Sequence, residues 1–163
     1  MIRFLITISV LTVLLSCGFK PMYKHSENSI DFRNYSITLI NENDTSREIK
    51  EEIKKSFPSS SEIEKKYIIE INTDENFEAL ITNTDGTVAK YRIEIIINYK
   101  VKDKQKDSYL IEDMVRGFAQ YTVETSEIES DDKRKRMVRT ATNGAIQMMI
   151  SKIQSDTSIT NDN

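Results

Sequence analysis

The sequence predicts an α+β domain in which two helices pack on one face of a mostly antiparallel four-stranded sheet, in the order β-α-β-β-β-α. Three observations lead to this class. Apolar and polar side chains alternate over residues 89–101, a length that requires a sheet with one buried and one wetted face. Residues 45–57 and 126–153 instead carry apolar side chains at helical intervals of three and four. Two such helices need a surface to cover, and the apolar face of the sheet is the one available.

The first sixteen residues have the order of a secretory signal peptide. A short positive start containing Arg3 precedes an apolar run over residues 4–15, and Ser16 is small enough for a cleavage site. The run is too short to cross a bilayer as a stable helix. We therefore expect residues 1–16 to be removed.

Cys17 follows this segment directly and is the single cysteine of the chain. The sequence Leu-Leu-Ser-Cys resembles the lipobox of bacterial lipoproteins, which implies a diacylglyceryl group on the thiol, cleavage before the cysteine and acylation of the new amine. Two or more acyl chains hold a protein at a membrane where one does not. The alternative is cleavage elsewhere and a free thiol. In the lipoprotein case, residues 17–34 form a lipidated tether that is polar from Lys24 onward.

A strand and a short helix are expected to open the domain. Residues 35–40 are β-branched and aromatic in alternation, which indicates a strand. Thr45 and Glu48 have the spacing of a capping box, and the helix that they begin must end before Pro58. If the next strand pairs with the first, the right-handed crossover rule makes the two parallel.

Two long strands joined by a hairpin are expected next. Residues 66–81 keep one alternation on both sides of the polar stretch 72–76, where we expect a bulge or bend. Asp85 and Gly86 accept the positive φ angles that a tight turn requires. The strand over residues 89–101 follows and is the clearest of the chain.

A fourth strand is predicted over residues 108–124. Its apolar residues fall on both faces, so we expect a bulge near residues 112–117 or burial on both sides. The last helix begins in the acidic segment 126–131. Its apolar stripe comprises Val138, Ala141, Ala145, Met148 or Met149, and Ile153. The predicted domain thus covers residues 35–154 and leaves a polar tail at 155–163.

Length and composition fit one compact domain. Of the 163 residues, 30% are charged and 38% hydrophobic, which suits a folded domain better than a disordered chain. The net charge of −3 gives no general attraction to nucleic acid, so we expect none as a partner. With Cys17 lipidated, no thiol remains for a disulfide or a cysteine-ligated metal site, and stability must come from packing.

Residues that could carry catalysis are sparse. The only histidine, His25, lies in the predicted tether, where no buried partner could tune it. No Walker loop, nucleophile elbow or dinucleotide glycine pattern occurs. We therefore expect a protein that is not an enzyme and that has no cofactor and no metal, with a lipid-anchored enzyme as the third class of function.

The opening Cys-Gly-Phe-Lys-Pro-Met-Tyr, residues 17–23, resembles the start of the lipopolysaccharide-assembly lipoproteins of the LptE family, particularly its alphaproteobacterial branch. Met22 stands where leucine is more usual. The resemblance implies an outer-membrane lipoprotein that is plug and assembly partner of the β-barrel translocon LptD and binds lipopolysaccharide. It also implies an α+β sandwich, in agreement with the elements above.

Gly18 bears on the membrane to which the lipid would attach. An aspartate at this place would, in the enteric sorting rule, retain a lipoprotein in the inner membrane, so Gly18 favours the outer one. The alternative function is an auxiliary lipoprotein of another envelope lipid-transport complex, of the ABC type.

Four basic residues share the polar face of the clearest strand: Lys90, Arg92, Lys100 and Lys102. Arginine and lysine hold phosphorylated sugars through charge-assisted hydrogen bonds, so this strip is a candidate site for the phosphates of lipopolysaccharide. The alternative is an ordinary solvated sheet face with Glu94 interleaved. The basic cluster at residues 133–136 is more simply a helix surface beside acidic neighbours.

Overall fold

The computed structural model describes residues 32–57 and 64–156. They form a short 3-10 turn, four strands and two helices. In chain order these are η1 (Phe32–Asn34), β1 (Tyr35–Leu39), α2 (Arg47–Ser56), β2 (Tyr67–Thr82), β3 (Val88–Asp103), β4 (Ser108–Thr122) and α3 (Glu127–Ser155). The predicted signal peptide, Cys17, His25 and the last seven residues of the predicted tail lie outside the described residues.

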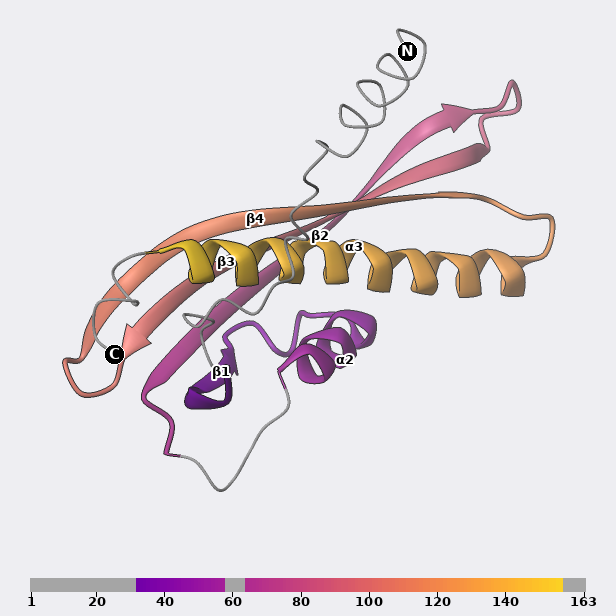
Figure 1. The fold of residues 1–163 in the computed structure, drawn as a ribbon. Coiled ribbons are helices and arrows are strands. Elements are labelled where there is room, and N and C mark those ends of the chain that lie inside the picture. The colour runs from indigo at the N-terminus through magenta and orange to yellow at the C-terminus, as the bar shows by residue number, and fades with distance from the viewer. Residues whose placement is uncertain (1–31, 58–63, 157–163) are drawn as a thin grey trace, which may run out of the picture.

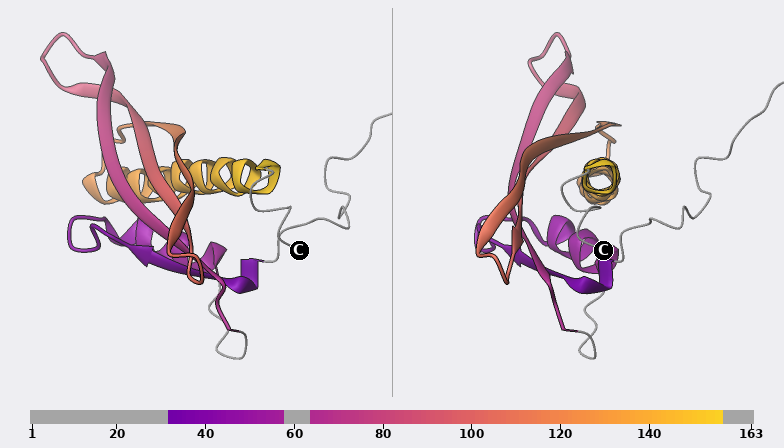
Figure 2. Two further views of the ribbon diagram at one scale, coloured as in Figure 1. Left: turned by 90° about the vertical axis from the view of Figure 1, so that its left-hand side faces the viewer. Right: turned by 60° about the vertical axis from the view of Figure 1, so that its left-hand side comes forward.

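The strands form one sheet in the order β1-β2-β3-β4. β1 pairs with β2 in parallel, and the other two pairs are antiparallel. Both helices lie on the same face of this sheet, α3 along β3 and β4 and α2 beside β1 and α3 (Figures 1 and 2). The predicted α+β class is therefore confirmed, and so is the parallel first pair, which α2 connects as a crossover.

The core lies between the helices and one face of the sheet. The alternation predicted for the clearest strand is confirmed, since the side chains from Ile93 to Val101 are buried at every second position of β3. The stripe on α3 meets them with these buried residues: Val138, Ala141, Thr142, Ala145, Ile146, Met149 and Ile153. Of the two methionines left open by the sequence, Met149 is buried and Met148 is 50% exposed.

Helix α3 packs tightly against the sheet at Gly117 of β4. A Cβ atom placed on Gly117 would lie 1.9 Å from the backbone oxygen of Ala141 and 2.8 Å from the backbone nitrogen of Ala145. Real Cβ atoms do not come so close to other heavy atoms. The depth at which α3 packs therefore depends on a glycine in the strand facing two alanines in the helix.

The bend predicted at residues 72–76 is wrong. β2 is continuous there, and its register with β3 is unbroken from Asn72 to Asn76. The polar residues of this stretch lie mainly on the outer face, where Asn98 donates to Asp74 (Nδ2 to Oδ2, 3.4 Å). The register of β2 instead shifts on either side of Ile81, near the turn.

Both expectations for the fourth strand are wrong as well. The register of β4 is continuous from Ile111 to Thr122, and its irregularity falls at Leu110, which is the extra residue between two paired positions. Burial is one-sided, because Met114 and Phe118 point to the outer face and are 40% and 53% exposed. Apolar residues fall on both faces of β4 in the sequence because some of them lie on the solvent-exposed outer face of the sheet.

The predicted capping box is also wrong. Ser46, not Thr45, precedes the first residue of α2, and Glu48 caps nothing. The Thr45 hydroxyl is buried, donates to the Asn41 carbonyl (2.9 Å) and lies 2.9 Å from the Thr73 hydroxyl. Asn41 in turn donates to the Thr73 carbonyl (2.7 Å) and accepts from its amide (3.1 Å). Thr45 thus joins the β1–α2 loop to β2, a tertiary role that the local pattern does not reveal.

Candidate functional site

The outer face of the sheet, turned away from the helices, carries the predicted basic strip. Lys90, Arg92, Lys100 and Lys102 alternate along β3 with residues of the buried face, so all four lie on the outer side as expected. Arg92 and Lys90 lie toward the β2–β3 turn, and Lys100 and Lys102 toward the opposite end of the strand. The strip therefore consists of two pairs of cations.

Acidic partners reduce the charge of this strip. Lys100 lies 2.8 Å from Glu112 on β4, Lys102 pairs with Asp107, and Arg92 pairs with Glu78 on β2. Hydrogen bonds to these carboxylates raise the pKa of both the Lys100 and the Lys102 ammonium. Within residues 32–57 and 64–156, no carboxylate lies within 4.0 Å of the Lys90 ammonium. An anionic ligand would thus meet the fewest competing carboxylates at Lys90.

Two residues that the sequence did not single out complete this face. Tyr109 of β4 lies under both lysine ammoniums, with its ring centroid 5.4 Å from Lys100 and 5.7 Å from Lys102. Arg116 of β4 lies 3.3 Å from Glu94 and adds a further cation. Their cross-strand positions follow from the β3–β4 register, which the pattern of one strand cannot supply.

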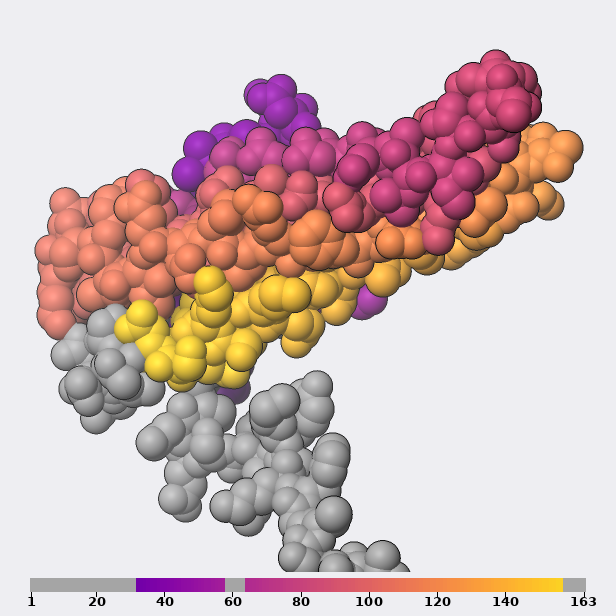
Figure 3. All heavy atoms as spheres, turned by 90° about the horizontal axis from the view of Figure 1, so that it is seen from above, coloured from indigo at the N-terminus to yellow at the C-terminus, as the bar shows by residue number. Residues whose placement is uncertain are grey.

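The β2–β3 hairpin, residues 77–91, presents apolar side chains to solvent. Phe77 and Ile81 are 42% and 53% exposed, and Leu80 is exposed beside them. The hairpin projects past α2 in the ribbon and forms the crimson end of the space-filling view (Figures 1 and 3). Gly86 closes its turn at φ 86°, so the Asp-Gly turn is confirmed. We call residues 77–91 the distal hairpin.

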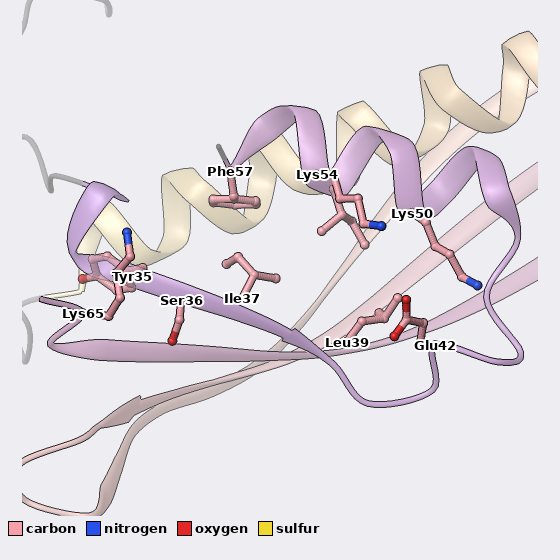
Figure 4. Close-up of a pocket in the computed structure, with 10 residues that line it drawn as sticks. Tyr35, Ser36, Ile37, Leu39, Glu42, Lys50, Lys54, Phe57 and Lys65 are labelled. Atoms are coloured by element: carbon pink, nitrogen blue, oxygen red, sulfur yellow. The ribbon is translucent and has the colours of Figure 1, made fainter. Parts of the chain in front are cut away.

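A groove of about 520 Å³ lies between β1 and α2. Its floor is apolar. Ile37 and Leu39 contribute to it from β1, Ile53 from α2 and Phe57 from the end of that helix, as Figure 4 shows for the labelled residues. Its polar lining comprises Tyr35, Ser36, Glu42, Lys50, Lys54 and Lys65. An apolar floor edged by three ammonium groups and one carboxylate, that of Glu42, favours an elongated ligand with negative charge.

Tyr35 closes one end of this groove. Its side chain is 5% exposed, and its hydroxyl has no hydrogen-bond partner among the described residues. Burial raises the pKa of the Tyr35 hydroxyl well above its usual range. Its ring stacks on Tyr67 with a centroid separation of 4.9 Å, and the Phe32 ring packs against it with a centroid separation of 5.3 Å. These aromatic contacts fix β1 against β2.

The described part of the chain holds no group of three or more histidine, cysteine, aspartate or glutamate side chains placed to bind a metal ion. Neither α2 nor α3 is long and apolar enough to span a membrane. The basic cluster at residues 133–136 is a helix surface as expected, since Arg134 lies 2.8 Å and Lys135 2.5 Å from Asp131.

Solved structures of bacterial lipoproteins share this fold. A candidate lipoprotein from Caulobacter crescentus matches 76% of this chain and 90% of its own, with a TM-score of 0.60 and 8% identity. An uncharacterised lipoprotein B from Nitrosomonas europaea matches 85% of this chain and 93% of its own (TM-score 0.58, 11% identity). A minor lipoprotein from Acinetobacter baumannii matches 77% and 93% (TM-score 0.54, 10% identity).

No family model matches the chain, and no curated protein matches it in sequence. At identities of 8 to 11%, the structural matches show a shared fold alone. The fold to which they point is the α+β sandwich predicted from the strand and helix patterns.

Proposed function

We propose that this protein is a lipid-anchored lipoprotein of the outer membrane that takes part in lipopolysaccharide assembly. In this proposal Cys17 carries the lipid, and the protein is plug and assembly partner of the β-barrel LptD and binds lipopolysaccharide. The opening motif at residues 17–23 carries the proposal. The fold supports it, because the same sandwich occurs in three bacterial lipoproteins.

The described surface suits the inside of a wide barrel. A barrel lumen is polar, and the outer sheet face presents paired charges such as Lys100 with Glu112 and Arg116 with Glu94. The distal hairpin offers exposed apolar side chains, including Phe77 and Ile81, for contact with a partner. The protein acts by binding in this account, without catalysis.

Lipopolysaccharide would bind where cations and apolar side chains meet. Lys90 and Arg92 lie at the base of the distal hairpin, and the β2–β3 register places Ile81 opposite Lys90. A phosphate can accept hydrogen bonds from both cations while neighbouring acyl groups contact the apolar residues. Arg92 must then exchange Glu78 for the phosphate, which exposed ion pairs permit because they are weak.

Co-purification tests the proposed partnership. The full chain, extracted from its own membranes in a mild detergent, should bring down a large β-barrel protein in stoichiometric amount. Recovery of an inner-membrane ABC transporter instead would support the alternative function and overturn this one. The same preparation, screened for hydrolase activity on lipids and glycans, should remain inactive.

Charge reversal tests the proposed lipopolysaccharide contact. The double variant Lys90→Glu/Arg92→Glu should bind lipopolysaccharide about thirtyfold more weakly, since each reversed charge near a phosphate costs roughly 1 kcal/mol. Its circular dichroism should be unchanged, because both side chains are on the outer face. The variant Lys133→Glu/Arg136→Glu alters α3 by the same charge and should bind normally. Equal affinity in all three proteins would mean that the strip is an ordinary solvated surface.

A further inference from the structure

The outer edge of β1 is unpaired in the described part of the protein. At both ends of β1, the backbone hydrogen bonds to β2 involve even-numbered residues. The Ile40 amide donates to the Ile71 carbonyl (2.8 Å), and the Asn34 carbonyl accepts from the Lys66 amide (2.9 Å). The odd-numbered residues Tyr35, Ile37 and Leu39 therefore turn their backbone N–H and C=O groups to the opposite side. β1 is the last described strand on that side, so no strand within residues 32–57 and 64–156 pairs with these groups.

The other edge of the sheet is protected, whereas no described element covers the edge at β1. Along β4, Lys152 of α3 donates to the Met114 carbonyl (3.3 Å) and to Asp113 (2.5 Å), and the helix packs against the strand. Charged side chains and covering elements are the usual means by which proteins prevent unwanted pairing at edges. β1 is Tyr-Ser-Ile-Thr-Leu and has no charge, proline or bulge. It has the composition of a strand that accepts a partner.

The groove beside this edge has a helix as its second wall. α2 runs alongside β1, and the groove of about 520 Å³ lies between them (Figure 4). An added strand would place every second side chain over Ile37, Leu39 and Ile53. Strand–helix grooves of this kind accept extended peptides, with the backbone pairing on the strand and alternate side chains entering the groove.

Lysines at the rim determine the charge of such a peptide. Lys50 and Lys54 are four residues apart on α2, a spacing of about 6 Å between Cβ atoms. Alternate side chains of a strand are about 6.6 Å apart, so two acidic residues in alternation match the two lysines. Neither lysine has a carboxylate within 4.0 Å among the described residues. A glutamate would lay its methylenes on the apolar floor and its carboxylate at an ammonium.

We propose that the β1–α2 groove binds an extended acidic segment of a partner protein, which adds a fifth strand to the sheet at β1. The segment has glutamate or aspartate at alternate positions facing α2. This site lies on the opposite side of the domain from the outer face and does not depend on the proposed lipopolysaccharide contact.

Amide hydrogen exchange of the full chain in detergent micelles tests this proposal. Without ligand, the Ile37 and Leu39 amides should exchange fast and the Thr38 amide, which faces β2, slowly. The capped peptide Thr-Ile-Thr-Glu-Thr-Glu-Thr, whose two glutamates are in alternation, should slow exchange at Ile37 and Leu39 by roughly tenfold or more at saturation. The same peptide N-methylated at alternate residues keeps its charges and should give no protection.

Charge variants separate the ionic contribution from backbone pairing. Lys50→Glu/Lys54→Glu should weaken binding of the acidic peptide by about tenfold and should favour a version with lysine in place of glutamate. Lys55→Glu, which changes a neighbouring lysine that faces Glu52, is the matched control and should bind normally.

Three results would overturn the proposal. Slow exchange at Ile37 and Leu39 in the chain without peptide would mean that another part of this chain, or a second copy, already covers the edge. Equal protection by the N-methylated peptide would exclude strand addition. Protection by phosphatidylglycerol vesicles but not by the peptide would assign the groove to an anionic lipid.

Discussion

The close contact between β4 and α3 predicts that Gly117→Ala destabilises the protein. The new Cβ would lie 1.9 Å from the Ala141 oxygen and 2.8 Å from the Ala145 nitrogen. Both atoms belong to the helix backbone, so no side-chain rotation can relieve the clash. Either α3 retreats or β4 bends.

The geometry gives the size of the effect. A carbon–oxygen contact of about 3.3 Å requires a displacement of about 1.4 Å at this point. Such a shift separates the buried stripe of α3, including Val138 and Ile146, from the buried face of β3 and β4. Overpacking costs about 1 to 3 kcal/mol, and the lost contacts add to it. We expect a loss of about 2 to 4 kcal/mol in the free energy of unfolding.

Gly144 provides the matched control. It lies in the middle of α3, and a Cβ placed on it would meet nothing within 4 Å. Gly144→Ala should therefore raise the free energy of unfolding by about 0.5 to 1 kcal/mol, because alanine favours the helix. Urea denaturation of the full chain, followed by circular dichroism, measures both variants against the parent. Stability of Gly117→Ala within about 0.5 kcal/mol of the parent would refute this account of the helix–sheet contact.

Three further predictions concern the anchor, an ion pair and a loop. Cys17→Ala should leave the chain uncleaved or released from membranes, as fractionation and mass spectrometry would show, and unchanged membrane retention would contradict the anchor. The Lys152 hydrogen bond lowers the pKa of Asp113, so the pair stabilises the fold above about pH 4 and its contribution is lost as the pH falls through the lowered value. Asp113→Asn should thus lower the free energy of unfolding by at most about 0.5 kcal/mol at pH 7, because the pair is largely exposed. In acid, where Asp113 is protonated, the substitution should leave the free energy of unfolding unchanged. Urea titrations at neutral and acidic pH would show both results. Asn41→Ala should cost about 1 to 2 kcal/mol in the same assay, since it removes two hydrogen bonds to Thr73.

Patterns that repeat over a long stretch predicted the fold correctly. The alternation along β3 placed its buried and outer residues, and the stripe on α3 gave most of the residues that cover them. Both patterns have many members, so one exception does not change the result. The Asp85-Gly86 turn was predictable because few residues accept the positive φ that Gly86 adopts.

Predictions from short patterns were wrong where a tertiary contact outweighed them. Thr45 bonds Thr73 across the loop instead of capping α2, and polar residues 72–76 continue β2 because β3 supplies a partner along their whole length. Phe118 is apolar yet lies on the outer face, so the alternation of apolar residues along β4 did not identify its buried face. In each case the deciding partner is at least eighteen residues away in sequence, the shortest separation being Asn76 to Glu94.

The sequence by itself determined the element order, the buried face of β3 and the segment at Cys17 on which the proposed anchor depends. Only the tertiary structure showed that Arg92, Lys100 and Lys102 are each paired with a carboxylate, and that β1 and α2 enclose a groove. The physical reason is that periodicity reports which side of an element is apolar, whereas charge pairing, close approach and unpaired edges depend on register and on the depth of packing between distant segments.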